Sequence, residues 1–372
     1  MSFQLERDAI VALLDAHGRG LAEAWAQFRE QAPPVRYRGV PRQCVWRDGP
    51  RRLYRYDPEP RTPDSKRPDS ARPDGAEPEA TAPLLMVYAM VNRPRILDLT
   101  AERSLISELG KRGQTVYLLD WGRPHRDDWA LDFNDHAITA LGQATEAVVA
   151  DSGHARIVLL GVCQGGVMAL CRAMAAPQQL GGVITTVTPV DFQVPGDRLS
   201  ALVRRIDIDL LKSSGRRISG GMLRQLFLAL KPIALGHGKY IDLARSLRDP
   251  ARLNDFLEME AWIADSPDQP SAVMSEFLEL FYQRNSLVND TLELGGRPLR
   301  LSALSLPMLN IYATDDHIVP PAASRALAAC VPASDYEELA VRGGHIGLYV
   351  GRNALTRVPQ AVCDFCQRVS GA

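Results

Sequence analysis

Apolar residues form two kinds of pattern along the chain, and each pattern predicts a different kind of element. Near-continuous apolar runs occupy 84–91, 115–120, 156–161, 183–188 and 308–313, and a sixth strand candidate spans 335–340. Continuous runs are typical of strands that are buried on both faces, while the amphipathic stretches between them predict helices. The sequence therefore predicts an α/β fold with a mostly parallel sheet flanked by helices.

The segments before and between these runs show other patterns of apolar and polar residues. An amphipathic helix is predicted within 1–37, and it either docks on the core or meets another protein. The segment 38–82 holds two short strand pieces joined through Asp48-Gly49, a hairpin signal, and then a Pro-rich stretch expected to be a disordered loop. The core comprises 83–190 and 300–372. The mainly helical insertion 191–299 is expected to be a cap over the carboxyl edge of the sheet.

Charge and cysteine content exclude several classes of protein. The chain has 43 basic and 44 acidic residues, so no field of one sign favours nucleic acid as a partner. It shows no apolar signal-peptide region and no apolar run of the ~18–20 residues that a membrane span needs, so we expect a cytoplasmic protein. Cys363 and Cys366 form a single CxxC, which is read as incidental, and no metal site is expected.

The strongest chemical motif lies where the third apolar run meets a helical segment. It reads Gly161-Val162-Cys163-Gln164-Gly165-Gly166. A strand that turns sharply into a helix needs small neighbours, and glycine supplies them. The pattern is that of a nucleophile elbow with cysteine in place of serine, so it predicts Cys163 as the nucleophile. The N–H groups and the dipole at the helix start favour a thiolate.

Candidates for an acid and a base follow later in the chain. Asp315 and Asp316 come directly after the fifth apolar run, and His345 stands in a glycine-flanked loop after the sixth strand candidate. The order nucleophile, acid, histidine is the order of α/β hydrolases. Both aspartates are candidates for the acid, with Asp316 preferred. His317 is an alternative base, but it adjoins the acid in sequence, so His345 is preferred.

An acyl-transfer site also needs donors for a developing oxyanion. The backbone N–H of Gln164, the residue after the nucleophile, is the first candidate. The second is expected in the loop after the first apolar run, near Val91 and Asn92.

With these motifs in place, the chain resembles the catalytic subunit of class III polyhydroxyalkanoate synthases. The resemblance extends over about residues 40–370 and rests on the segments 88–94 (YAMVNRP), 120–124 (DWGRP), 161–166 (GVCQGG), 187–192 (VTPVDF), 262–269 (WIADSPDQ), 316–321 (DHIVPP) and 344–347 (GHIG). It supports Asp316 as the acid and His345 as the base. The Pro-rich loop is longer than the family pattern. The chain lacks the long N-terminal extension of one-component synthases, which favours a two-component class, and class III over class IV.

The resemblance implies an α/β-hydrolase fold and an acyltransferase. It would transfer (R)-3-hydroxyacyl groups, expected to be 3-hydroxybutyryl, from coenzyme A to a growing polyester through an acyl-Cys163 intermediate. The CoA thioester is the substrate, and no cofactor is implied. The implied partners are an E-type (or R-type) subunit, the surface of polyester granules and further copies of the chain. Asp316 would orient His345 or help to activate the 3-hydroxyl group, and both roles stay open.

Two other functions compete with this one. A cysteine hydrolase of the dienelactone type or a polyester depolymerase would share the fold, but neither needs the segments 120–124 and 262–269. A non-catalytic granule-associated protein would not need Cys163, Asp316 and His345 together.

Overall fold

The computed structural model describes residues 39–59, 81–213, 215, 217–230, 250–332, 334 and 336–370. The chain divides into two compact units, and the larger one comprises Gly39–Leu230 and Met259–Ala372. The predicted helix at 1–37 and most of the Pro-rich loop lie outside the described residues. The sheet and the candidate site both belong to the larger unit.

A single large sheet organises this unit. The order across the sheet is β1 (Gln43–Asp48), β2 (Arg51–Tyr56), β6 (Val116–Asp120), β3 (Leu84–Val87), β7 (Ile157–Val162), β8 (Leu180–Thr186), β13 (Met308–Ala313) and β14 (Tyr336–Val341). In this order, neighbouring strands from β6 to β14 are parallel, while β2 runs antiparallel to β6 and forms a hairpin with β1. The fold class predicted from the sequence is confirmed.

Successive residues of each central strand enter different cores. In β7, Leu159 belongs to the apolar cluster that includes Leu141 and Val167 of the helices on one face. Leu160 belongs to the cluster that includes Val362 on the other face. Because side chains alternate across a strand, a sheet covered on both faces needs apolar residues at every position, which explains the continuous runs.

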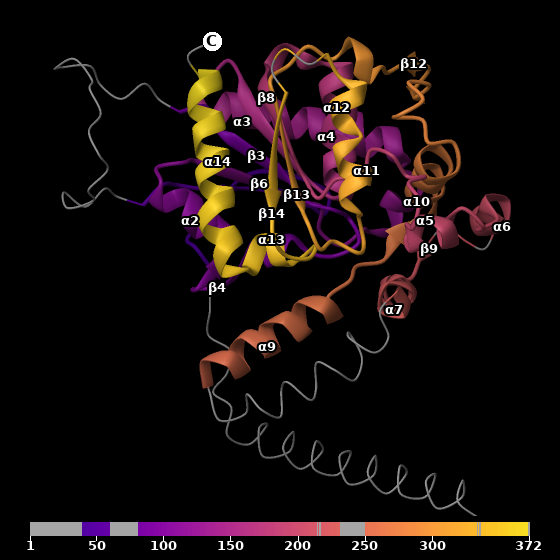
Figure 1. Cartoon of the computed structure of the whole chain (residues 1–372), viewed down its shortest axis with the longest axis horizontal. Coiled ribbons are helices and arrows are strands. Elements are labelled where there is room, and N and C mark those ends of the chain that lie inside the picture. Colours follow the sequence, from indigo (N-terminus) through magenta and orange to yellow (C-terminus); the bar gives the residue numbers. More distant parts are fainter. Residues whose placement is uncertain are drawn as a thin grey trace, which may run out of the picture. The chain divides into compact units, whose positions relative to one another are not determined.

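Helices cover both faces of the sheet. Figure 1 shows the strands between α14 and α2 on the left and α4, α11 and α12 on the right. Within the described residues, the α-helices outside the insertion are α2 (Leu105–Lys111), α3 (Leu141–Ser152), α4 (Gln164–Ala175), α11 (Pro321–Arg325), α12 (Leu327–Cys330), α13 (Gly347–Val350) and α14 (Arg352–Ser370). Cys363 and Cys366 of the CxxC lie in α14. Among the described residues, no helix has the length and apolarity that a membrane crossing requires.

The first central strand is shorter than its apolar run. β3 ends at Val87, so the prediction that it continues to residue 91 is wrong. Tyr88 and Met90 are nevertheless 4% exposed. In this segment, side chains replace the backbone hydrogen bonds between strands. Trp121 Nε1 donates to the Tyr88 carbonyl at 3.0 Å, and the Met90 N–H donates to Gln164 Oε1 at 3.0 Å. Apolar residues in this segment therefore indicate burial without strand pairing.

The insertion between β8 and β13 is mainly helical where it is described. It contains α5 (Arg198–Val203), α6 (Ile208–Ser213), α7 (Gly220–Leu230), α9 (Pro250–Ala264), α10 (Ser271–Phe277) and a π-helical turn, η6 (Leu278–Gln283). A short pairing joins β9 (Arg217–Ile218) to β10 (Gln269–Pro270). Phe277 and Phe281 lie 5.7 and 5.2 Å from the ring of Phe133, which precedes α3. Aromatic packing thus holds this part of the insertion against the sheet-flanking helices.

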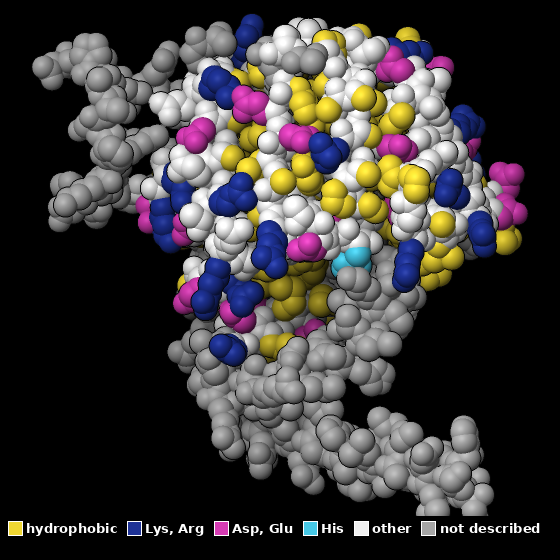
Figure 2. Space-filling model, in the orientation of Figure 1, with side chains coloured by type: hydrophobic (Ala, Val, Ile, Leu, Met, Phe, Trp, Pro, Cys, Tyr) yellow, Lys and Arg dark blue, Asp and Glu magenta, His cyan; other side chains and the backbone are white. Residues whose placement is uncertain are grey.

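The described surface carries both signs of charge. Figure 2 shows Lys and Arg side chains interspersed with Asp and Glu over the face in view. This agrees with the formal net charge of −1.

Candidate active site

Cys163 stands at the junction of β7 and α4. Its backbone has φ 53° and ψ −118°, and the helix begins at the next residue. A residue with a Cβ adopts positive φ only when its surroundings impose the conformation. The strand–turn–helix that the sequence predicts for an elbow is therefore present, with Cys163 as its strained residue.

The glycines around Cys163 are required by close backbone approach. A Cβ on Gly165 would overlap the carbonyl oxygen of Val87, and one on Gly166 would overlap the side chain of Thr188. A Cβ on Gly161 would overlap Gly166 itself. The start of α4 thus packs directly on the chain that leaves β3 and β8, which sets Cys163 at the carboxyl end of the sheet.

Asp316 and His345 follow the two neighbouring strands β13 and β14, and the structure brings them together. His345 Nδ1 lies 2.7 Å from Asp316 Oδ2, and both residues are 7% exposed. The other carboxylate oxygen, Oδ1, accepts the N–H groups of Ile318 at 2.8 Å and Val319 at 3.0 Å. The Cys163 side chain lies near enough to His345 to influence its charge.

The two alternatives left open by the sequence now have positions. Asp315 is exposed, and its N–H donates to the carbonyl of Gly343 at 2.9 Å. It is Asp316 whose carboxylate meets a histidine, and that histidine is His345 rather than the adjacent His317. The geometry matches the preferred member of each pair.

The charges around His345 oppose the effect of its burial. Burial alone would lower the pKa of His345, but the carboxylate of Asp316 and the negative charge of the Cys163 thiolate raise it more strongly. Together with the hydrogen bond to Asp316 and the polar interaction with Cys163, they raise the pKa of His345 to about 10. The imidazole therefore holds its proton at neutral pH beside Cys163.

Three tyrosines that sequence reasoning did not single out lie in the electrostatic environment of Cys163. Burial, and then the charge of Cys163, raise the pKa of Tyr88 and of Tyr282, and the same two causes contribute to the raised pKa of Tyr349. Tyr88 follows β3, Tyr349 belongs to α13 and Tyr282 comes from the insertion. A Phe-Tyr pair inside an apolar helix gives no signal of this position, because the contact depends on tertiary folding.

Cys163 also packs against apolar side chains from separate parts of the chain. Val194 of the insertion, Val319 and Ala323 form a small cluster that Cys163 and Ile318 join. Cys163 itself is partly buried. The nucleophile candidate thus packs against a small apolar cluster to which the insertion contributes.

The predicted oxyanion donors lie on the two segments that meet at the elbow. Gln164 is the first residue of α4, and Val91 lies in the loop between β3 and η1 (Pro94–Leu97). The Met90 N–H is engaged by the Gln164 side chain. Among the described residues, no hydrogen bond engages the N–H of Val91. Their role in catalysis stays a prediction.

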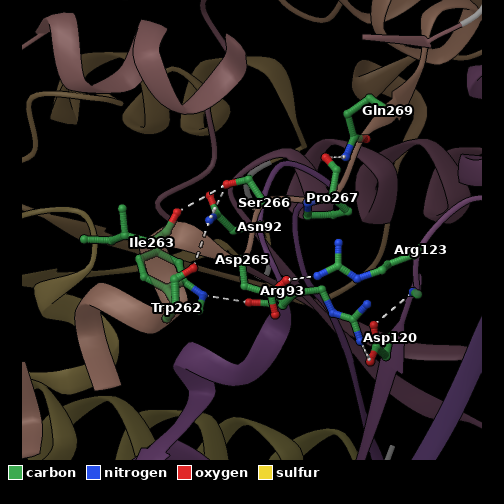
Figure 3. Close-up of polar contacts among 11 residues, drawn as sticks. Asn92, Arg93, Asp120, Arg123, Trp262, Ile263, Asp265, Ser266, Pro267 and Gln269 are labelled. Carbon is green, nitrogen blue, oxygen red and sulfur yellow. Dashed lines mark hydrogen bonds and ion pairs between the residues drawn. The ribbon is translucent and has the colours of Figure 1, made fainter. Parts of the chain in front are cut away.

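Polar contacts join the loop after β3 to Asp120 and to the insertion. Figure 3 shows Arg93 paired with Asp120, and Asn92 and Arg93 in contact with Trp262 and Ser266 of the insertion. Arg93 Nη2 lies 2.7 Å from Asp120 Oδ2. Within the described residues no group of His, Cys, Asp and Glu side chains is arranged to hold a metal ion.

The comparisons agree with this architecture. Residues 83–351 match the family model described as the alpha/beta hydrolase fold. A soluble variant of monoglyceride lipase from Saccharomyces cerevisiae, solved with a substrate analog, superposes with a TM-score of 0.57 at 14% identity, over 91% of this chain and 98% of that one. This likeness shows the fold.

Relatives with higher identity define the family more narrowly. The poly(3-hydroxyalkanoate) polymerase subunit PhaC of Allochromatium vinosum is 41% identical over 87% of both chains. The subunit of the same name from Synechocystis sp. is 38% identical over 88% of this chain and 84% of its own. The chain therefore belongs to the poly(3-hydroxyalkanoate) polymerase PhaC family, within the α/β hydrolases.

Proposed function

We propose that the chain is the catalytic subunit of a polyhydroxyalkanoate synthase that transfers (R)-3-hydroxyacyl groups, with 3-hydroxybutyryl as the expected unit, from CoA to a polyester. The observation that carries the proposal is the hydrogen-bonded pair His345–Asp316 in the electrostatic environment of Cys163, which stands at an elbow of positive φ. The PhaC name of the relatives supports the polyester as product. In this proposal the CoA thioester is the substrate, and no cofactor takes part.

In the first half-reaction, the Cys163 thiolate attacks the thioester carbonyl of the acyl-CoA. The carbonyl oxygen becomes an oxyanion, which the N–H groups of Gln164 and Val91 would stabilise. The intermediate collapses with cleavage of the carbon–sulfur bond to CoA, and the departing CoA thiolate takes the proton of His345. The products are acyl-Cys163, free CoA and a neutral imidazole. Exchange of one thioester for another is close to isoenergetic, so CoA release needs no added energy source.

In the second half-reaction, a 3-hydroxyl group attacks the acyl-Cys163 carbonyl. Its proton passes to His345, an ester bond forms, and Cys163 leaves as the thiolate, which restores the original ion pair. Asp316 orients the His345 ring through Nδ1 in both halves. Whether Asp316 also acts on the hydroxyl depends on the position of the polymer end.

The apolar surroundings of Cys163 support transfer to an alcohol rather than to water. Val194 of the insertion belongs to the apolar cluster that Cys163 joins, and Tyr282 of the insertion lies within the electrostatic reach of Cys163. Water that reached the acyl-cysteine would end the chain by hydrolysis. We propose that this insertion acts as the cap. We further propose that a second synthase subunit of the E type (or R type), a granule surface and further copies of the chain are its partners.

Replacement of the nucleophile tests the proposal. Cys163→Ala should abolish release of CoA from 3-hydroxybutyryl-CoA while circular dichroism stays unchanged, because alanine fits the turn without steric conflict. The matched control is Cys330→Ala, which removes a partly buried cysteine of α12 and should retain activity. CoA release by Cys163→Ala above a few per cent of wild type would remove Cys163 from the mechanism.

A further inference from the structure

Met90 is held from two sides by the side chains of two glutamines. Its N–H donates to Gln164 Oε1 at 3.0 Å, and its carbonyl accepts from Gln269 Nε2 at 2.6 Å. Gln164 belongs to the elbow helix α4, whereas Gln269 belongs to β10 in the insertion. Gln164 is 4% exposed and Gln269 is 2% exposed, so water does not compete for either bond.

The hydrogen bond of Gln269 fixes the direction of a neighbouring N–H group. The Met90 carbonyl and the Val91 N–H belong to the same peptide unit, which is planar and trans. In a trans peptide the carbonyl and the N–H point in opposite directions. A donor that anchors the Met90 oxygen therefore orients the Val91 N–H, the second proposed oxyanion donor.

The chemistry of Gln269 is specific for this task. Its Nε2 donates to two carbonyls, that of Met90 and that of Pro267 at 3.2 Å, so only the amide nitrogen fits between them. Within the described residues its Oε1 is buried without a hydrogen-bond partner.

Further bonds join the same two segments, as Figure 3 shows. Trp262 Nε1 donates to the Arg93 carbonyl at 2.8 Å, and Asn92 Nδ2 donates to Ser266 Oγ at 3.0 Å. The segment 262–270 of the insertion is thus docked along the loop 90–93. Only the bond of Gln269 acts on a peptide that carries a candidate oxyanion N–H, because the Arg93 carbonyl precedes a proline.

We infer that Gln269 is a positioning residue for acyl transfer: it orients the Val91 N–H, so that the oxyanion hole is complete only while segment 262–270 is docked on the loop 90–93. The inference rests on the proposed acyl transfer at Cys163. It links the position of the insertion to the rate of the chemical step, in addition to access of the substrate.

The chain offers a matched control in Gln114. This glutamine is 1% exposed, donates through Nε2 to the carbonyls of Ala82 at 2.9 Å and Thr115 at 3.1 Å, and has a buried Oε1 without a partner among the described residues. It lies at the amino end of β6, at the opposite end of the strand from the site. Gln269→Met and Gln114→Met therefore remove the same kind of bond in two places.

Two rates measured on the full-length protein separate positioning from general damage. Acylation is followed as single-turnover CoA release from saturating 3-hydroxybutyryl-CoA, and thiolate reactivity as alkylation of Cys163 by iodoacetamide, quantified by peptide mass spectrometry. Alkylation forms no oxyanion. Gln269→Met should lower acylation on the order of 10- to 100-fold, somewhat less than outright loss of an oxyanion donor. Its alkylation rate should stay within about twofold of wild type. Gln114→Met should change neither rate.

A second variant covers the case in which Gln269→Met does not fold. In Gln269→Glu a protonated carboxyl can still donate to the Met90 carbonyl, whereas the carboxylate faces two oxygens with no donor. Burial raises a carboxyl pKa, so acylation relative to wild type at the same pH should recover as pH falls from 8 towards 5.5. A flat ratio across this range would contradict the inference.

The failures of the two proposals can be told apart. Wild-type acylation by Gln269→Met, with Cys163→Ala inactive, overturns the positioning role and leaves the catalytic proposal standing. Parallel loss of acylation and alkylation in Gln269→Met also overturns it, since that pattern means general disruption. CoA release by Cys163→Ala overturns the catalytic proposal itself, whatever Gln269 does.

Discussion

Asp316 uses its two carboxylate oxygens for different partners. Oδ1 is fixed by the N–H groups of Ile318 and Val319, and Oδ2 meets His345. Because the fixing donors belong to the backbone of the same loop, the carboxylate is oriented before any substrate arrives. Such preorganisation is what a triad acid requires.

Replacement of this acid should reveal the orientation. In Asp316→Asn, an amide nitrogen must face either the backbone N–H groups or His345 Nδ1. Either His345 can no longer donate through Nδ1, or the loop loses the hydrogen bonds that Oδ1 now accepts. We expect kcat/KM for CoA release to fall on the order of 10³- to 10⁴-fold. The exposed neighbour supplies the control, and Asp315→Asn should have a mild effect. A severe loss in Asp315→Asn alone would show that the acid is misassigned by one residue.

The raised pKa of His345 predicts how the reactivity of Cys163 depends on pH. Because the pKa is about 10, the imidazolium persists across pH 7 to 9 and is lost only as pH rises through that value. Because the proposed mechanism pairs this imidazolium with a Cys163 thiolate, alkylation of wild-type Cys163 by iodoacetamide should change little between pH 7 and 9.

His345→Gln provides the comparison for that profile. Without the imidazolium, alkylation at pH 7 should be slower and should climb with pH, as for ordinary cysteines, which titrate near ~8.5. CoA release by the same variant should fall on the order of 10²- to 10⁴-fold. An identical, flat alkylation profile in both proteins would show that His345 does not hold the thiolate.

At the scale of elements, the contact between α4 and β3 leaves no room for a methyl group. Gly165→Ala should push the elbow helix away from the Val87 carbonyl, and we expect a loss of stability on the order of 3 kcal/mol with loss of CoA release. Gly221→Ala, on the exposed side of α7, should be neutral or stabilising by up to about 1 kcal/mol. The midpoints of thermal unfolding of the two variants are compared. Equal midpoints would contradict the close approach of α4 to β3.

The sequence predicted the elements in which buried apolar residues follow a regular pattern along the chain. The strands at 308–313 and 156–161 were located to within one residue, because both faces of the sheet demand apolar side chains. Cys163, Asp316 and His345 could be proposed as the site from the sequence because each follows a strand in an expected order. The end of β3 was missed because Trp121, Gln164 and Gln269 replace its ladder, and these bonds join residues far apart in sequence. Tyr282 was missed for the same reason.

At the scale of the whole molecule, the proposed cap would both shield Cys163 from water and obstruct access to it. The charge of Cys163 acts on Tyr282, and Val194 belongs to an apolar cluster that Cys163 joins, while CoA and a growing polyester are bulky. We expect the isolated chain to turn over slowly and with a lag, and addition of a partner subunit to remove the lag. A competent state populated at ~1% would lower apparent activity by about that factor. Full activity of the isolated chain at low concentration, without a lag, would indicate a self-sufficient enzyme.

The two edges of the large sheet bear on how copies of the chain can meet. β1 carries a bulge between Cys44 and Trp46. At the other edge, Glu337 and Glu338 of β14 pair with Arg368 and Arg325 of neighbouring helices. Bulges and charged side chains discourage an edge strand from accepting a further strand. An assembly of copies is therefore expected to form through helices and loops, and the sheet itself is protected from growing into a continuous intermolecular one.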